Sequence, residues 1–136
     1  MRGSMIEAAV GYAAGPRGEG IAYALLSASG KQRLIRLTFR VPDAAGFIDR
    51  ASGYAALTTL AETLRARGLA RVRFLLGDAA LVAEINQRKV LADALVLPYV
   101  RLHCALNALS SYSVRVQTTD DLTQRARAEA ALNLAA

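Results

Sequence analysis

The stretch VRFLLGDAALVAEIN, residues 72–86, decides the fold class of this chain. A short apolar run rich in β-forming residues spans residues 71–76, and Gly77-Asp78 then opens a segment with helical spacing from about Ala79 to Asn86. Asp78 can cap that helix, because its carboxylate accepts a hydrogen bond from a free N–H group of the first turn. A strand that leads directly into a helix is typical of parallel pairing, so we expect part of the sheet to be parallel.

The residues before this unit predict three antiparallel strands. Residues 6–13 alternate with a period of two, and the turn at residues 15–20 contains three glycines and a proline. Residues 21–27 and 32–41 form the next two predicted strands. One face of the third predicted strand, residues 32–41, carries Arg36, Thr38 and Arg40, and the other face carries apolar side chains. This pattern is typical of a sheet with one covered face.

The rest of the chain predicts helices around one more strand. A helix spans about residues 50–67, and a third helix carries an apolar stripe at Leu95, Tyr99, Leu102, Leu106 and Leu109. Residues 112–117 alternate as a strand, and residues 121–134 form a last helix with an acidic first turn. The order βββαβααβα predicts an α/β fold with a mixed five-stranded sheet flanked by helices.

Length and composition indicate one domain. The 136 residues, 54% of them hydrophobic, are enough for a single core. Residues 1–4, Met-Arg-Gly-Ser, resemble a vector-derived leader, and we expect the domain to span residues 5–136. No apolar run approaches the roughly 18 residues of a membrane-spanning helix, so we expect a soluble protein without a membrane partner.

The cysteine and histidine content argues against a zinc site. Cys104 is the only cysteine and His103 the only histidine, too few for a zinc site of about four ligands. We expect Cys104 to pack as a small side chain and His103 to be solvated. A lone cysteine also favours a cytoplasmic location.

The charge pattern makes nucleic acid a candidate partner. The net charge is +6, and only Lys31 and Lys89 of the 17 basic residues are lysines. Arginine is well suited to bidentate phosphate contacts. The alternative is a coding bias towards arginine, with the arginines of the third strand forming a solvated face that protects a sheet edge.

Four stretches, in this order, resemble the ribonuclease H family. They are VGYAAGPRGEGIAYALL (10–26), ASGYAALTTLAETL (51–64), VRFLLGDAALVAEIN (72–86) and RARAEAALNLA (125–135). The resemblance implies a ribonuclease H-like fold from about Glu7 onwards. It also implies hydrolysis of the RNA strand of RNA/DNA hybrids by two magnesium ions, which a cluster of carboxylates would hold.

The resemblance places two of the four family carboxylates on glycine. Gly11 stands at the first-strand position and Gly53 at the position near the start of the first long helix. Asp78 is retained in residue type and motif, and Glu129 falls on the position in the last helix. The implied catalytic and metal-binding remnants are therefore Asp78 and Glu129. The plainer alternatives are a helix cap for Asp78 and an ordinary exposed side chain for Glu129.

These observations lead to three functional hypotheses. The first is a non-catalytic module without a cofactor that binds an RNA/DNA hybrid or duplex through Arg17, Arg36, Arg40 and Arg50. The second is a weakly active ribonuclease H that uses Mg²⁺ or Mn²⁺ at Asp78 and Glu129. The third is a structural or self-association domain that forms a homodimer.

Overall fold

The computed structural model describes residues 5–41, 46–90 and 92–135. The expected leader at residues 1–4 lies outside this range. The elements are the strands β1 (Ile6–Ala14), β2 (Glu19–Ala28), β3 (Lys31–Arg40), β4 (Arg71–Leu76) and β5 (Ser111–Val116), and the helices α1 (Ile48–Ala66), α2 (Ala79–Gln87), η1 (Asp93–Leu95), α3 (Val96–Asn107) and α4 (Asp120–Ala135). None of the described helices is long and apolar enough to cross a membrane.

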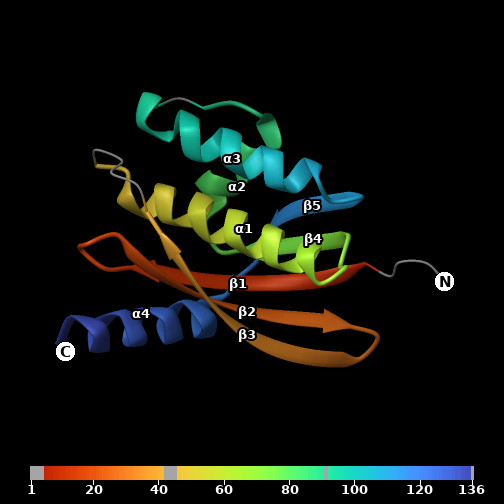
Figure 1. Ribbon diagram of the computed structural model, residues 1–136, viewed down its shortest axis with the longest axis horizontal. Helices are drawn as coiled ribbons and strands as arrows, with labels where there is room; N and C mark the ends of the chain where they lie inside the picture. Colours follow the sequence, from red (N-terminus) through yellow and green to blue (C-terminus); the bar gives the residue numbers. More distant parts are fainter. Residues whose placement is uncertain (1–4, 42–45, 91, 136) are drawn as a thin grey trace.

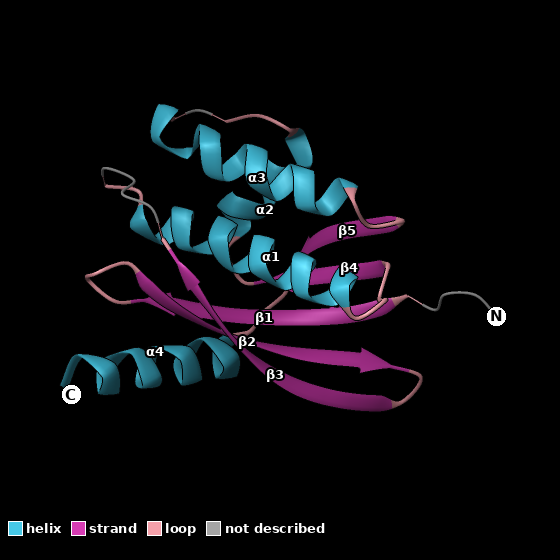
Figure 2. Cartoon of the chain, in the orientation of Figure 1, coloured by secondary structure: helices cyan, strands magenta, loops and turns pink. Residues whose placement is uncertain are grey.

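The predicted mixed sheet is confirmed. Its strand order is β3-β2-β1-β4-β5, and Figure 2 shows the sheet with helices on both faces. The β1–β2 and β2–β3 pairs are antiparallel. The β1–β4 and β4–β5 pairs are parallel, as the strand–helix unit at residues 71–86 predicts. The carboxyl ends of β1 and β4 therefore lie at the same edge of the sheet.

The helices form two layers of unequal size. Helices α1, α2 and α3 lie over one face of the sheet, and α4 lies over the other (Figure 1). Side chains alternate between the two faces of β1. Ala8 and Val10 are buried on the face covered by α1, α2 and α3, and Gly11 lies on the other face, against the backbone of α4. The largest fully buried side chains are Tyr54, Phe74, Leu57, Leu60, Leu64, Leu76, Leu81, Ile85, Leu95, Leu102, Leu106 and Val10.

Two expectations about α3 are wrong. His103 is partly buried, with its ring 4.4 Å from the Tyr99 ring, and burial lowers its pKa from the usual value. Cys104 is exposed instead of packed inside. The predicted apolar stripe of α3 is correct. His103 lies next to this stripe, beside Tyr99, and is therefore partly buried although it is not one of the stripe residues.

Candidate functional site

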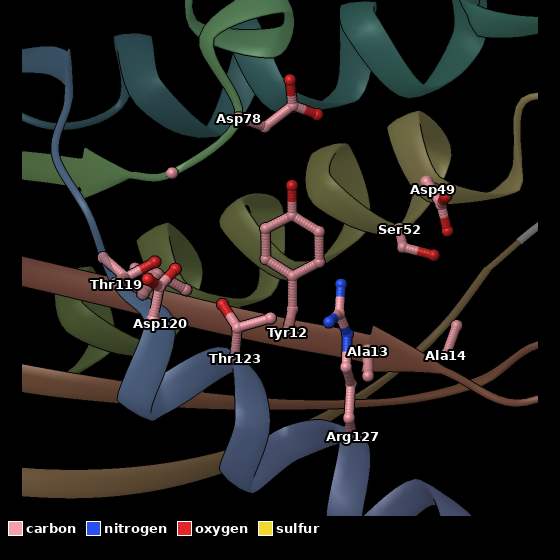
Figure 3. Close-up of a pocket in the computed structure, with 12 residues that line it drawn as sticks. Tyr12, Ala13, Ala14, Asp49, Ser52, Asp78, Thr119, Asp120, Thr123 and Arg127 are labelled. Carbon is pink, nitrogen blue, oxygen red and sulfur yellow. The ribbon is translucent and has the colours of Figure 1, made fainter.

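A polar cavity of about 430 Å³ opens at the edge of the sheet where β1 and β4 end. Five parts of the chain line it: the end of β1, the start of α1, the turn after β4, the turn before α4, and α4 itself (Figure 3). Its residues are Val10, Tyr12, Ala13, Ala14, Asp49, Ser52, Gly77, Asp78, Thr119, Asp120, Thr123 and Arg127. The cavity thus combines three carboxylates with one guanidinium group.

The side chain of Tyr12 stands in the middle of this cavity. Figure 3 shows its ring rising from β1 with the hydroxyl group directed towards Asp78. A β-carbon at Gly53 would lie 2.6 Å from that hydroxyl oxygen, so the ring uses space that a side chain at residue 53 would need. Burial, and then the negative charge of Asp78, raises the pKa of Tyr12 above its usual value. Tyr12 is therefore a neutral phenol at physiological pH.

Both carboxylate oxygens of Asp78 face donors from the protein. Oδ1 accepts a hydrogen bond from the backbone N–H of Leu81 at 3.1 Å, which is the helix cap that the sequence predicts. Oδ2 lies 3.9 Å from Nε of Arg50. The positive partner of this carboxylate is thus a guanidinium group of α1.

Arg50 also binds a buried carboxylate, which no sequence motif singles out. Glu84 of α2 is only 8% exposed, and its Oε2 accepts a hydrogen bond from Arg50 Nη1 at 3.0 Å. The Tyr54 hydroxyl donates to Oε1 of the same carboxylate. One signal was available, because Glu84 follows Leu81 by three residues and so falls on the buried side of α2.

Gly11, which the resemblance places at the first-strand carboxylate position, faces α4 and does not line the cavity. A β-carbon at residue 11 would lie 2.2 Å from the backbone nitrogen of Thr123 and 2.4 Å from the carbonyl carbon of Leu122. No side chain fits there, because both obstacles are backbone atoms of α4. Val10 and Tyr12 lie on the other face of β1 and line the cavity. Neither residue carries a carboxylate, so β1 supplies no carboxylate to the cavity.

The structure also does not bring together Glu129 and Asp78, the two predicted catalytic and metal-binding remnants. Glu129 accepts hydrogen bonds from Arg36, with Nε at 2.7 Å, and from the Tyr23 hydroxyl, so it lies over β2 and β3. The bonds from Arg36 and Tyr23 lower its pKa to about 2. The α4 residues that line the cavity are Asp120, Thr123 and Arg127 instead.

The residues of the cavity do not fit a pair of magnesium ions. Hard divalent cations need several oxygen ligands that converge on one point. Within residues 5–41, 46–90 and 92–135, no group of three or more acidic, histidine or cysteine side chains comes together in that way. Tyr12 fills the space beside Gly53, and Arg50 and Arg127 bring positive charge to the same region.

The four predicted nucleic-acid-binding arginines divide into two pairs. Arg36 binds Glu129 and Arg50 binds Glu84, so each has a protein carboxylate as its partner. Arg17 and Arg40 are both exposed and lie at the same end of the sheet, because the Val41 N–H donates to the Gly18 carbonyl at 2.7 Å. The end of β1 that lines the cavity lies at this same end of the sheet.

Comparison with known proteins finds similar structures but no similar sequences. No protein-family model matches the chain, and no curated protein matches it. Ribonuclease H1 from the archaeon Halobacterium salinarum NRC-1 superimposes with a TM-score of 0.73 at 18% identity, covering 96% of this chain and 98% of that one. The N-terminal ribonuclease H domain of rv2228c from Mycobacterium tuberculosis has a TM-score of 0.67 at 15% identity and the same coverage.

A third similar structure is LC11 ribonuclease H1, isolated from compost by a metagenomic approach. Its TM-score is 0.63 at 13% identity, and the match covers 97% of this chain and 99% of that one. The chain therefore has the ribonuclease H-like fold, over nearly its whole length. This confirms the fold that the four sequence stretches imply.

Proposed function

We propose that this domain binds nucleic acid, an RNA/DNA hybrid or a duplex, without cleaving it. The observation that carries the non-catalytic part is the phenol of Tyr12 in the space beside Gly53, within a cavity where the described residues form no convergent carboxylate cluster. Two-metal hydrolysis needs such a cluster to hold both ions near the scissile phosphate. The neutral side chain of Tyr12 supplies neither the negative charge nor the carboxylate oxygens that bind such metal ions.

The binding part rests on charge and fold. The chain carries a net charge of +6, and Arg17, Arg40 and the cavity residue Arg127 are exposed at one end of the sheet. Guanidinium groups bind phosphate oxygens through paired donors. A structure of LC11 ribonuclease H1 in complex with an RNA/DNA hybrid has a TM-score of 0.64 to this chain at 11% identity. We leave Arg36 and Arg50 out of the proposed interface, because each binds a carboxylate of the protein.

The test measures fluorescence anisotropy of a labelled RNA/DNA hybrid, and of the matching DNA duplex, over a series of salt concentrations. Binding through phosphates predicts that log K falls linearly with log salt concentration. Arg17→Glu, Arg40→Glu and Arg127→Glu should each weaken binding about tenfold and reduce the salt slope by about one per lost phosphate contact. The matched control is Arg71→Glu, an exposed position at the start of β4, at the opposite end from Asp78.

The same samples test catalysis. With Mg²⁺ or Mn²⁺ present, the labelled RNA strand should be recovered intact. Cleavage that disappears in Asp78→Asn would overturn the non-catalytic part and favour the weakly active ribonuclease H. Absence of binding to both probes at low salt would overturn the binding part.

A further inference from the structure

The solvent-facing side of α3 is apolar. Val96, Leu97 and Val100 are 47%, 55% and 47% exposed, and helical spacing places them on one side of the helix. Cys104, one turn beyond Val100, is exposed on the same side. The opposite side of α3 packs against the rest of the domain: Leu102 and Leu106 are buried, and Tyr99 packs edge-on against Tyr54 of α1.

This surface differs from the other helical surfaces of the molecule. Of the eight large apolar side chains that are exposed within the described residues, three belong to this short stretch. Figure 1 shows α3 as the outermost element of its layer, with α1 and α2 beneath it. Apolar side chains scattered singly over a surface are normal, whereas a contiguous patch with a polar rim marks an interaction site.

The charges that flank the patch are complementary to each other. Asp93 precedes α3 by one turn, and Arg101 lies within α3, each four residues from Leu97. Both residues are exposed. A two-fold axis through Leu97 would place Asp93 of each copy beside Arg101 of the other, since a two-fold interface pairs residue i with residue j twice.

We propose that this face of α3 joins two copies of the chain in an antiparallel helix pair. Leu97 of each copy lies at the crossing point, flanked by Val96 and Val100. The two Asp93–Arg101 pairs close the rim. A contact built on one helix per copy is smaller than the roughly 800 Å² per partner of a stable interface, so the dimer dissociates on dilution. The proposal does not depend on the proposed function.

The first experiment is sedimentation velocity on nucleic-acid-free protein over a wide range of concentrations. We expect a reversible shift from monomer to dimer. Leu97→Glu should abolish the dimer, because it buries two like charges at the crossing point. The matched control is Leu132→Glu on α4, which is 70% exposed and should dimerise like the unaltered chain. A monomer at every concentration would overturn the proposal, as would a dimer that Leu97→Glu leaves unchanged.

A charge swap tests the antiparallel arrangement without altering the apolar patch. Asp93→Arg alone should weaken the dimer, because it places two arginines side by side at each rim position. The double variant Asp93→Arg with Arg101→Asp should restore it. Circular dichroism of each variant confirms that the helices persist. If the double variant dimerises no better than Asp93→Arg, the two-fold axis does not pass through Leu97 and the proposed pairing is wrong.

Discussion

The phenolic oxygen of Tyr12 lies 2.6 Å from the point at which residue 53 would carry a β-carbon, so this tyrosine and Gly53 share one space. Tyr12 comes from β1 and Gly53 from α1, two elements that meet at the candidate site. The glycine accommodates the ring, and the ring occupies the space that a side chain at residue 53 would need. A substitution at either position therefore affects the packing of the other.

A Gly53→Ala variant tests this relationship. The added methyl group would lie 2.4 Å from Leu81 Cδ2 as well as close to Tyr12, so the neighbours must move. Overpacking costs about 1–3 kcal/mol and the gain in helix propensity returns about 1 kcal/mol, so we expect a net loss of up to roughly 2 kcal/mol in unfolding free energy. Urea denaturation measures it. In a Tyr12→Ala background the loss should shrink, and strictly additive effects would show that the two residues do not share space.

A Gly11→Ala variant should be more damaging, because its neighbours are backbone. The β-carbon would lie 2.2 Å from the Thr123 nitrogen, so α4 would have to move away from β1. We expect a loss of about 3 kcal/mol or more in unfolding free energy. The control is Gly77→Ala, where the nearest atom would lie 3.4 Å away and the change should stay within about 0.5 kcal/mol. Equal losses for the two variants would contradict the close approach of α4.

Glu84→Ala should destabilise the domain through the network around Arg50. The substitution leaves the buried Tyr54 hydroxyl without its acceptor and removes one carboxylate from Arg50. Arg50 is 28% exposed and can partly turn to water, so we expect a loss of about 2–4 kcal/mol. Glu62→Ala, an exposed position on α1, is the control for helix propensity. If both variants lose the same small amount in urea denaturation, the network does not stabilise the fold.

Glu129 makes stability depend on pH in the acid range. Its hydrogen bonds from Arg36 and Tyr23 lower its pKa in the folded protein to about 2, whereas an unfolded glutamate titrates near pH ~4.3. Between these values the unfolded chain binds the proton and the folded chain does not, so unfolding free energy falls as pH decreases from about 4.3 towards 2. Glu129→Gln should flatten this part of the profile in urea denaturation, while Glu62→Gln should leave it unchanged. A steep profile in Glu129→Gln would assign the effect to other carboxylates.

Local sequence patterns were sufficient for the element order and the mixed sheet. The period of two in residues 6–13 and 32–41, the Gly77-Asp78 turn and the stripe on α3 each depend on neighbours within a few residues. The Asp78 cap was predictable for the same reason, since its partner is the N–H of Leu81.

Contacts between distant elements could not be predicted in this way. One residue of strand register decides that Gly11 meets α4 while Val10 and Tyr12 line the cavity. The rotation of α4 on the sheet decides that Glu129 binds Arg36 instead of approaching Asp78. Residue type and spacing thus determined the fold of this protein. Only the tertiary structure decided which side chains meet, because a hydrogen bond or a steric overlap depends on ångström-scale distances between segments far apart in the chain.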